Sequence, residues 1–177
     1  MAVNRAAWFG LGVAACIAAG VLGAAAFVGS GLYNIGADDH HLKAVLALIE
    51  QLRNRSIAVR SRDIVVPPLD DAGKISAGAR QYAMLCVACH LAPGTEKSPI
   101  RAGMYPHPPS LAQEGVHDPA SAFWTIKHGI KMSAMPAWGK SLNDAAIWDV
   151  VAFLEKLPDM DPLAYGAAVA SPSVVSP

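Results

Sequence analysis

Two cysteines and a histidine stand close together in the stretch "CVACH", residues 86–90. Thiols at positions i and i+3 lie on one turn of a helix, and an imidazole follows them at once. Such a group can be a redox-active dithiol, half of a zinc site, or an attachment site for haem, in which the thiols form thioether bonds and the histidine binds iron. The surrounding sequence distinguishes these interpretations.

The dithiol and zinc interpretations fit the surrounding sequence poorly. A redox dithiol usually lies where a strand meets a helix N-terminus, whereas here a helical pattern precedes the cysteines. A structural zinc ion needs four ligands, and the remaining cysteine, Cys16, lies in a distant apolar segment. The Cys-x-x-Cys-His spacing is typical of c-type haem, so we predict one haem c attached through Cys86 and Cys89, with His90 as an iron ligand.

The second axial ligand is expected in the stretch "HGIKMSAMPAWG" (128–139), which offers Met135, Met132 and His128. Pro136 follows Met135, restricts the backbone and has no amide proton, which favours an irregular loop that can present a thioether to iron. We therefore predict Met135 as the sixth ligand. Met132 is expected in the wall of the haem pocket or at a helix end.

From Ala6 to Val28 the sequence contains no charged residue, and about 20 apolar residues suffice to cross a bilayer as a helix. Arg5 precedes this segment and no cation follows it closely, so the positive-inside rule predicts a cytoplasmic N-terminus. Two alternatives are a cleaved signal peptide and lipidation at Cys16. In each case we expect the haem domain in the periplasm of a bacterium, with a single-pass anchor in the inner membrane as the main hypothesis.

An amphipathic helix is expected from about Asp39 to Arg55, capped by Asp38 or Asp39. Its apolar stripe comprises Leu42, Val45, Leu46, Ile49 and Leu52. Cations outnumber anions in residues 40–62, so this stretch can lie on anionic lipid, on a partner subunit or on the chain's own domain. Residues 56–69 look extended, and Pro67 and Pro68 mark a linker.

Two further helices are expected around the irregular middle of the chain. The segment "AGKISAGARQYAML" (72–85) leads directly into the cysteines, and "NDAAIWDVVAFLEKL" (143–157) is capped by Asn143 and stopped by Pro158. The apolar stripe of the second helix comprises Ile147, Val150, Val151 and Leu154. A short helix is expected near residues 118–129. Because so much of this domain is irregular, its own core is small, and a bulky apolar cofactor would complete it.

Residues 72–158 resemble the class I cytochromes c, especially the small monohaem cytochromes of bacterial respiratory chains. Gly78, Tyr82 and Cys86 reproduce the opening "G-x-x-x-aromatic-x-x-x-C-x-x-C-H" of that family, and "PPSL" (108–111) and "MPAWG" (135–139) are also similar to it. The resemblance implies a mainly α fold around one covalent haem.

The resemblance also implies roles for single residues. It makes His90 and Met135 the axial ligands and indicates that the carbonyl of Pro93 accepts a hydrogen bond from the His90 ring. It further implies that Gly78 allows the first helix of the domain to cross closely over the last one, where Val150 and Phe153 meet it.

Several other residues are candidates for contacts with haem or with a partner. Trp138, Tyr105 and Arg101 can pair with haem propionates, although core packing for the aromatics and exposure for the arginine are equally good interpretations. The cations that could surround an exposed haem edge and attract an acidic partner are Lys127, Lys131 and Lys140.

The predicted organisation has four parts. Residues 1–33 form a transmembrane anchor, 34–70 an amphipathic helix and linker, 71–163 the cytochrome c domain and 164–177 a disordered tail. The chain is therefore expected to be mainly α, with a class I cytochrome c-like domain preceded by a transmembrane helix and an amphipathic helix.

An iron with both axial positions filled carries one electron and is closed to substrates, so we predict an electron carrier rather than an enzyme. Lys plus Arg and Asp plus Glu both number 14, which gives no indication of nucleic-acid binding. Expected partners are a quinol-oxidising complex or periplasmic dehydrogenase upstream and an oxidase or reductase downstream. The alternatives are a haem enzyme, a gas or redox sensor with an open sixth position, and a structural haem subunit.

Overall fold

The computed structural model describes residues 4–171. Within these residues the chain forms helices and one isolated bridge between Ala92 and Thr95, and no strand, which confirms the mainly α prediction. The chain divides into two compact units at Asp39 and His40, inside the segment that was expected to link the anchor to the domain.

The first unit contains helix α1 (Arg5–Ser30), which forms over the predicted apolar segment. The side chain of Asn4 caps it by accepting a hydrogen bond from the amide of Ala6 at 3.1 Å, and Gly31 ends it in the left-handed conformation. Within the described residues α1 is the one helix long and apolar enough to cross a membrane, and none of its side chains is buried by the protein.

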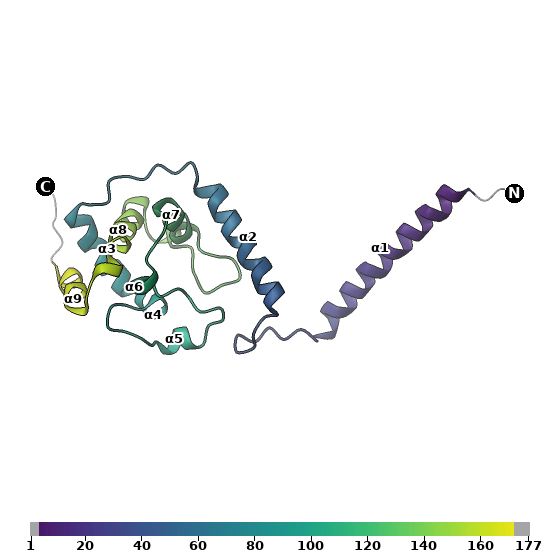
Figure 1. The fold of residues 1–177 in the computed structure, drawn as a ribbon, viewed down its shortest axis with the longest axis horizontal. Coiled ribbons are helices and arrows are strands. Elements are labelled where there is room, and N and C mark those ends of the chain that lie inside the picture. The colour runs from purple at the N-terminus through teal and green to yellow at the C-terminus, as the bar shows by residue number, and fades with distance from the viewer. Residues whose placement is uncertain (1–3, 172–177) are drawn as a thin grey trace. The chain divides into compact units, whose positions relative to one another are not determined.

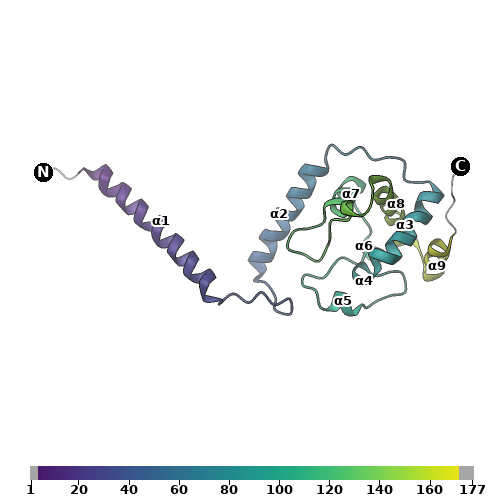
Figure 2. The ribbon, with the colours of Figure 1, turned by 180° about the vertical axis from the view of Figure 1, so that it is seen from behind.

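The second unit is built on the pair α3 (Ala72–Leu85) and α8 (Asp144–Leu154), which pack side by side (Figure 1). Both helices were expected, although α8 ends three residues earlier than predicted. Helix α9 (Pro162–Ala170) covers α3, and α7 (Pro119–His128) packs on α8 (Figure 2). The largest side chains that are fully buried are Tyr82, Phe153, Ile147, Leu157, Val150 and Val151.

The closest approach in this unit is the crossing of α3 over α8 at Gly78. A Cβ atom built on Gly78 would lie 1.9 Å from the carbonyl oxygen of Asp149 and 2.9 Å from the Cβ of Phe153. Since no side chain can occupy that space, the two helix backbones are in direct contact there. The crossing expected from the resemblance is present, with the Asp149 backbone as the nearest neighbour and Phe153 beside it.

Helix α2 (Lys43–Ser61) extends further towards the C-terminus than expected and includes residues 56–61, which were predicted as extended. The helical pattern continues because no proline or glycine interrupts it before Pro67. The N-cap is Leu42, without a side-chain bond, because Asp39 turns back and accepts a hydrogen bond from Asn34 at 3.1 Å. The expected cap by Asp38 or Asp39 is therefore wrong.

The surface of α2 also differs from the prediction. The helix packs against α7, where Ser61 is buried and its hydroxyl lies 2.9 Å from that of Ser121. Val45 and Leu46 are partly covered, but the other members of the expected stripe are exposed: Leu42, Ile49 and Leu52. The packed face is therefore rotated relative to the expected one, and α2 lies on its own domain.

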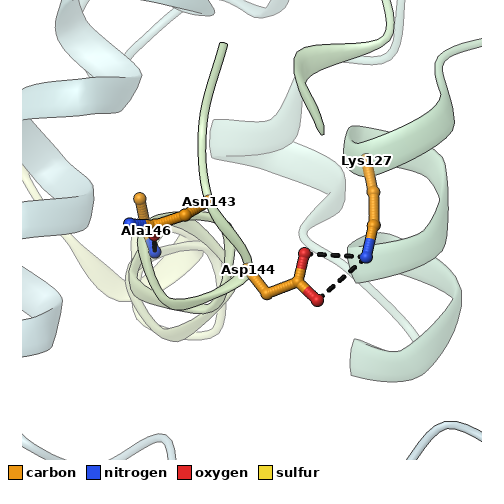
Figure 3. A network of polar contacts seen from close by, with 4 residues as sticks. All are labelled: Lys127, Asn143, Asp144 and Ala146. Carbon is orange, nitrogen blue, oxygen red and sulfur yellow. Dashed lines mark hydrogen bonds and ion pairs between the residues drawn. The ribbon is translucent and has the colours of Figure 1, made fainter. Parts of the chain in front are cut away.

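Helices α7 and α8 are joined by an ion pair (Figure 3). The ammonium group of Lys127 lies 2.7 Å and 2.8 Å from the two carboxylate oxygens of Asp144. The predicted cap of α8 is confirmed, since the Asn143 side chain accepts a hydrogen bond from the amide of Ala146 at 2.8 Å. Lys127 is thus engaged within the domain, whereas Lys131 and Lys140 are exposed.

Short helical turns alternate with irregular segments in the remaining chain. They are α4 (Val87–His90), α5 (Pro99–Ala102), α6 (Leu111–Glu114), η1 (Trp138–Lys140) and η2 (Leu157–Asp159). The short helix expected near residues 118–129 is α7. Pro158 lies in η2, just after α8 has ended, in agreement with its expected role as a stop.

The expectation of a disordered tail from residue 164 is wrong for residues 164–170, which belong to α9. The carboxylate of Asp161 caps this helix by accepting a hydrogen bond from the amide of Ala164 at 2.7 Å, and Pro162 starts it. Tyr165 and Val169 pack against the core, so tertiary contact supplies what the sequence pattern did not show. The rest of the expected tail, 172–177, lies outside the described residues.

Replacement of Gly78 by alanine should destabilise the domain by about 3 kcal/mol or more, because the new methyl group would overlap the Asp149 backbone. The measurement is chemical unfolding of the full-length protein followed by circular dichroism. The matched control is Gly166→Ala in α9, where a Cβ meets nothing within 4 Å and should stabilise the helix by about 0.5–1 kcal/mol. Equal effects of the two substitutions would contradict the close crossing.

Candidate haem site

Helix α3 leads directly into the turn that carries the two cysteines. Cys86 ends α3 and begins α4, and its amide donates to the carbonyl of Tyr82 at 2.9 Å. The amides of Cys89 and His90 then donate to the carbonyl of Cys86 at 3.1 Å and 2.9 Å. The stretch "CVACH" is therefore one helical turn continued from α3, which puts the two thiols at the i and i+3 positions that were predicted.

The hydroxyl of Tyr82 ties this turn to the core. It donates to the carbonyl of Leu91 at 2.6 Å and lies 3.2 Å from that of His90. Tyr82 is fully buried, and burial raises the pKa of its hydroxyl far above the usual value, so it remains a donor. Leu91 has a positive φ of 62° with ψ 177°, which ends the helix immediately after His90. The histidine is thus held at the last helical position.

The two thiols do not have the properties of a redox dithiol. Cys86 and Cys89 are free and partly buried, and Cys86 packs against the core. Burial, followed by the nearby Cys89 thiol, raises the pKa of Cys86 to about 12, whereas a reactive dithiol needs a lowered pKa. Within residues 4–171, no three His, Cys, Asp or Glu side chains are grouped so that they could hold a metal ion such as zinc.

The imidazole of His90 is oriented by a backbone carbonyl. Its Nδ1 lies 3.0 Å from the carbonyl oxygen of Pro109, so Nδ1 carries the proton and donates it, which leaves the lone pair on Nε2. The predicted acceptor, Pro93, is wrong. Pro93 follows the motif closely in sequence, but the segment of residues 108–110, far along the chain, is the one that reaches the ring.

The protonation of His90 suits an iron ligand. Burial lowers the pKa of His90, the bond to Pro109 opposes that shift, the charge of Arg101 adds to it, and the charge of Glu114 opposes it. The net direction is downward, so the neutral imidazole that metals bind is the favoured form near neutral pH.

Met135 lies on a loop in which its own amide and carbonyl both form hydrogen bonds. Its amide donates to the hydroxyl of Ser133 at 3.1 Å, and its carbonyl accepts from the amide of Ile130 at 3.1 Å. Gly129 has φ 64°, and a Cβ there would lie 2.6 Å from the Met135 carbonyl oxygen. The Met135 side chain is partly buried against the core cluster to which Cys86 also packs.

The other candidates for the sixth ligand lie elsewhere. Met132 is fully exposed and has φ 58°, so it lies at the tip of the loop rather than in the predicted pocket wall. His128 is exposed at the end of α7, where its ring meets that of Trp124 at 4.8 Å. Of the three candidates, Met135 is therefore the one whose side chain packs into the domain.

These residues fit a covalently attached haem. Two free thiols on one turn, an imidazole whose Nδ1 bonds to a carbonyl and a thioether on a hydrogen-bonded loop are the kinds of group that hold c-type haem. A family model described as cytochrome C oxidase, cbb3-type, subunit III matches residues 73–154. This match supports a class I c-type cytochrome domain at residues 73–154. No curated protein and no solved structure shows a significant similarity to the chain.

The matched residues of this cytochrome run from the start of α3 to the end of α8, so they include the whole stretch that carries the candidate site. Membership in this family implies covalently bound haem and electron transfer through it. The resemblance inferred from the sequence is confirmed at this level.

The residues considered for haem propionates take other contacts in the cytochrome domain. Arg101 is partly buried, and its Nε donates to the carbonyl of Pro108 at 3.1 Å. Tyr105 stacks on His40 with ring centroids 4.0 Å apart, and Trp138 packs against the core. The side-chain Nδ1 of His107 lies 3.0 Å from the Arg101 carbonyl oxygen. Arg101 is thus part of the site's framework rather than a free surface charge.

Sequence reasoning missed several residues that shape this site. The Pro109 carbonyl and the Tyr82 hydroxyl hold the CVACH turn, while Gly129 and Ser133 hold the Met135 loop. Ser98 also contributes, since its hydroxyl donates to the carbonyl of Ala88 inside the motif. A serine two positions before Met135 and a glycine directly after α7 were signals for the loop, whereas nothing in the sequence near His90 pointed to Pro109.

Substitution of Tyr82 by phenylalanine should cost about 1–3 kcal/mol of unfolding free energy, since the carbonyls of His90 and Leu91 lose their buried donor. Thermal unfolding of the full-length protein provides the measurement. Tyr165→Phe is the control, because its hydroxyl has no hydrogen-bond partner among the described residues, and it should change stability by no more than about 0.5 kcal/mol. A loss as large in the control would argue against the proposed anchoring by Tyr82.

Proposed function

We propose that the protein is a membrane-anchored electron carrier with one haem c, attached through Cys86 and Cys89 and ligated by His90 and Met135. The observation that carries this proposal is the hydrogen bond from His90 Nδ1 to the carbonyl of Pro109, immediately after two partly buried thiols on the same turn. That bond orients the ring and leaves Nε2 available, which is the usual support for a metal-bound histidine.

Each of these residues has a separate role. Cys86 and Cys89 would hold the porphyrin on the end of α3, and His90 would donate Nε2 to iron on one side. The cofactor supplies one-electron chemistry by alternating between Fe(II) and Fe(III). The protein would contribute a rigid frame, since α3, the Tyr82 hydroxyl and the Pro109 carbonyl hold the CVACH turn and the His90 ring in place.

Met135 would fill the remaining axial position. Its thioether stabilises the reduced iron and gives a higher potential than a second histidine would. Its loop is held by Ser133 and by Gly129, so the sulfur would return to the same position after each electron transfer. With His90 and Met135 both bound to the iron, no position would remain open for a substrate, which favours a carrier over an enzyme.

The anchor and the location form a second part of the proposal. We infer that residues 1–33 hold the chain in the bacterial inner membrane, with the N-terminus in the cytoplasm and the cytochrome domain, residues 71–163, in the periplasm. The length and apolar composition of α1 support the span, and Arg5 before it supports the orientation. Residues 34–70 would connect the two parts, with α2 packed on the domain.

The partners are inferred from the family. Its description names a subunit of a cbb3-type cytochrome c oxidase, and we extend to this chain a place in, or beside, an oxidase-type respiratory complex. A quinol-oxidising complex or a periplasmic dehydrogenase would supply the electron. An oxidase or a reductase would receive it. Lys131 and Lys140 are exposed near the Met135 loop and could attract an acidic partner surface.

Replacement of Met135 by alanine should open the sixth position. The purified wild-type protein is expected to give a low-spin c-type spectrum with the weak sulfur-to-iron charge-transfer band and no response to carbon monoxide. Met135→Ala should lose that band and bind carbon monoxide when reduced. Met132→Ala is the matched control and should behave like wild type, because that side chain is fully exposed.

Three results would contradict the ligand assignments. A response to carbon monoxide in the wild type would favour an open site and hence an enzyme or a sensor. An unchanged spectrum in Met135→Ala, with a changed one in Met132→Ala, would transfer the role to Met132. A His90→Ala variant with normal haem content and spectrum would overturn the assignment of the other ligand.

Removal of residues 1–33 should release the protein from the membrane without changing its spectrum, because α1 belongs to a separate compact unit. The full-length protein should stay in the membrane pellet after alkaline carbonate extraction and dissolve in detergent.

Mass spectrometry of the full-length protein distinguishes the alternatives. Cleavage near the end of α1 indicates a signal peptide, and a fatty-acid adduct that Cys16→Ser abolishes indicates a lipoprotein. Extraction of the intact chain by carbonate would exclude the anchor.

A further inference from the structure

Three side chains form hydrogen bonds with the backbone of three consecutive residues, 108–110. The Nε of Arg101 donates to the carbonyl of Pro108 at 3.1 Å, and the ring of His90 donates to that of Pro109 at 3.0 Å. The amide of the next residue, Ser110, donates to a carboxylate oxygen of Glu114 at 3.0 Å. The carbonyl that orients the histidine therefore lies between a residue held by a cation and a residue held by an anion.

The two charged side chains differ in their surroundings. Arg101 is partly buried, whereas Glu114 is exposed at the end of α6, although the Ser110 that it contacts is only 4 % exposed. Arg101 itself is positioned by its own short helix, α5, whose N-cap Ser98 also bonds to the carbonyl of Ala88 within the CVACH turn. Both charges are thus tied to the backbone that surrounds His90.

We propose that Arg101 and Glu114 act as an opposed pair of charges that sets the reduction potential of the iron, Arg101 raising it and Glu114 lowering it. This inference rests on the proposed function, in which His90 binds haem iron. Both are positioning residues in this scheme, since neither needs to contact the cofactor: they act through the segment that holds the His90 ring and through the electrostatic field at that ring.

The sign follows from the charge that reduction adds. An electron entering the iron lowers the local charge by one, so a nearby fixed cation stabilises the reduced state and a nearby anion stabilises the oxidised state. Geometry places both charges close to the ring. Arg101 and Glu114 hold the residues directly before and after Pro109, whose carbonyl bonds to the His90 ring.

The two effects should be unequal. A charge that is partly buried is screened less by water and salt than one that is exposed, so Arg101 should have the larger influence. The contribution of Glu114 should shrink as the ionic strength rises, whereas that of Arg101 should persist.

The experiment compares the full-length holoprotein in detergent with three variants, using redox titration followed by the optical spectrum at low and at high salt. Arg101→Gln should lower the equilibrium constant for reduction about three- to tenfold, and a tenfold change corresponds to about 59 mV for one electron. Arg101→Lys keeps the charge and should stay close to wild type. Glu114→Gln keeps an oxygen that can accept from Ser110 and should raise the constant about twofold at low salt.

Glu114→Gln is the decisive variant. Loosened packing around a haem admits water and lowers the reduction potential. A structural defect in Arg101→Gln could therefore imitate the expected fall in potential. It could not produce the rise in potential expected for Glu114→Gln. A fall or no change in Glu114→Gln at low salt would overturn the proposal, and so would an equal fall in Arg101→Lys and Arg101→Gln. A wild-type protein without a c-type spectrum would overturn the proposed function and this inference with it, whereas a normal spectrum with unmoved potentials overturns the inference alone.

Discussion

The contact of α3 with α8 at Gly78 is the constraint on which the rest of the domain depends. The two backbones touch because residue 78 has no side chain, and Tyr82 and Phe153 then pack one turn further along, with ring centroids 5.3 Å apart. Since α3 continues into the CVACH turn, the angle and depth of this crossing also set where the two thiols and the histidine lie. A packing contact in the core thus determines the geometry of the candidate haem site.

Much of the site is irregular chain, which is held in place by hydrogen bonds from side chains to main-chain atoms. Hydroxyl groups of Tyr82, Ser98 and Ser133 and the ring of His90 each bond to main-chain atoms of a neighbouring turn or loop. Such bonds replace part of the regular main-chain hydrogen bonding that loops lack. The result is a frame in which the CVACH turn and the Met135 loop are each held by hydrogen bonds.

Much of the fold could be predicted because local patterns agree with the final structure. The extents of α1 and α3, the Asn143 cap and the buried stripe of α8 follow from charge-free length, helical spacing and capping chemistry. The prediction failed for α2, whose many apolar residues allow more than one packed face, and only contact with α7 selects one. It also failed for α9, whose short helix is stable through packing on the core rather than through its own pattern.

The sequence by itself determined which residues are candidates for the chemistry. Cys86, Cys89 and His90 form a unit through their spacing within one helical turn, and the proline after Met135 favoured that residue over Met132. Only the tertiary structure decided what surrounds them. It put the Pro109 carbonyl, and not that of Pro93, at the His90 ring, and it placed Arg101 and Glu114 on either side of that bond. The physical reason is that a motif describes neighbours along the chain, whereas the orientation and electrostatic surroundings of the His90 ring depend on neighbours in space. The close packing of α3 on α8 and the folding of the loops between them bring those neighbours together.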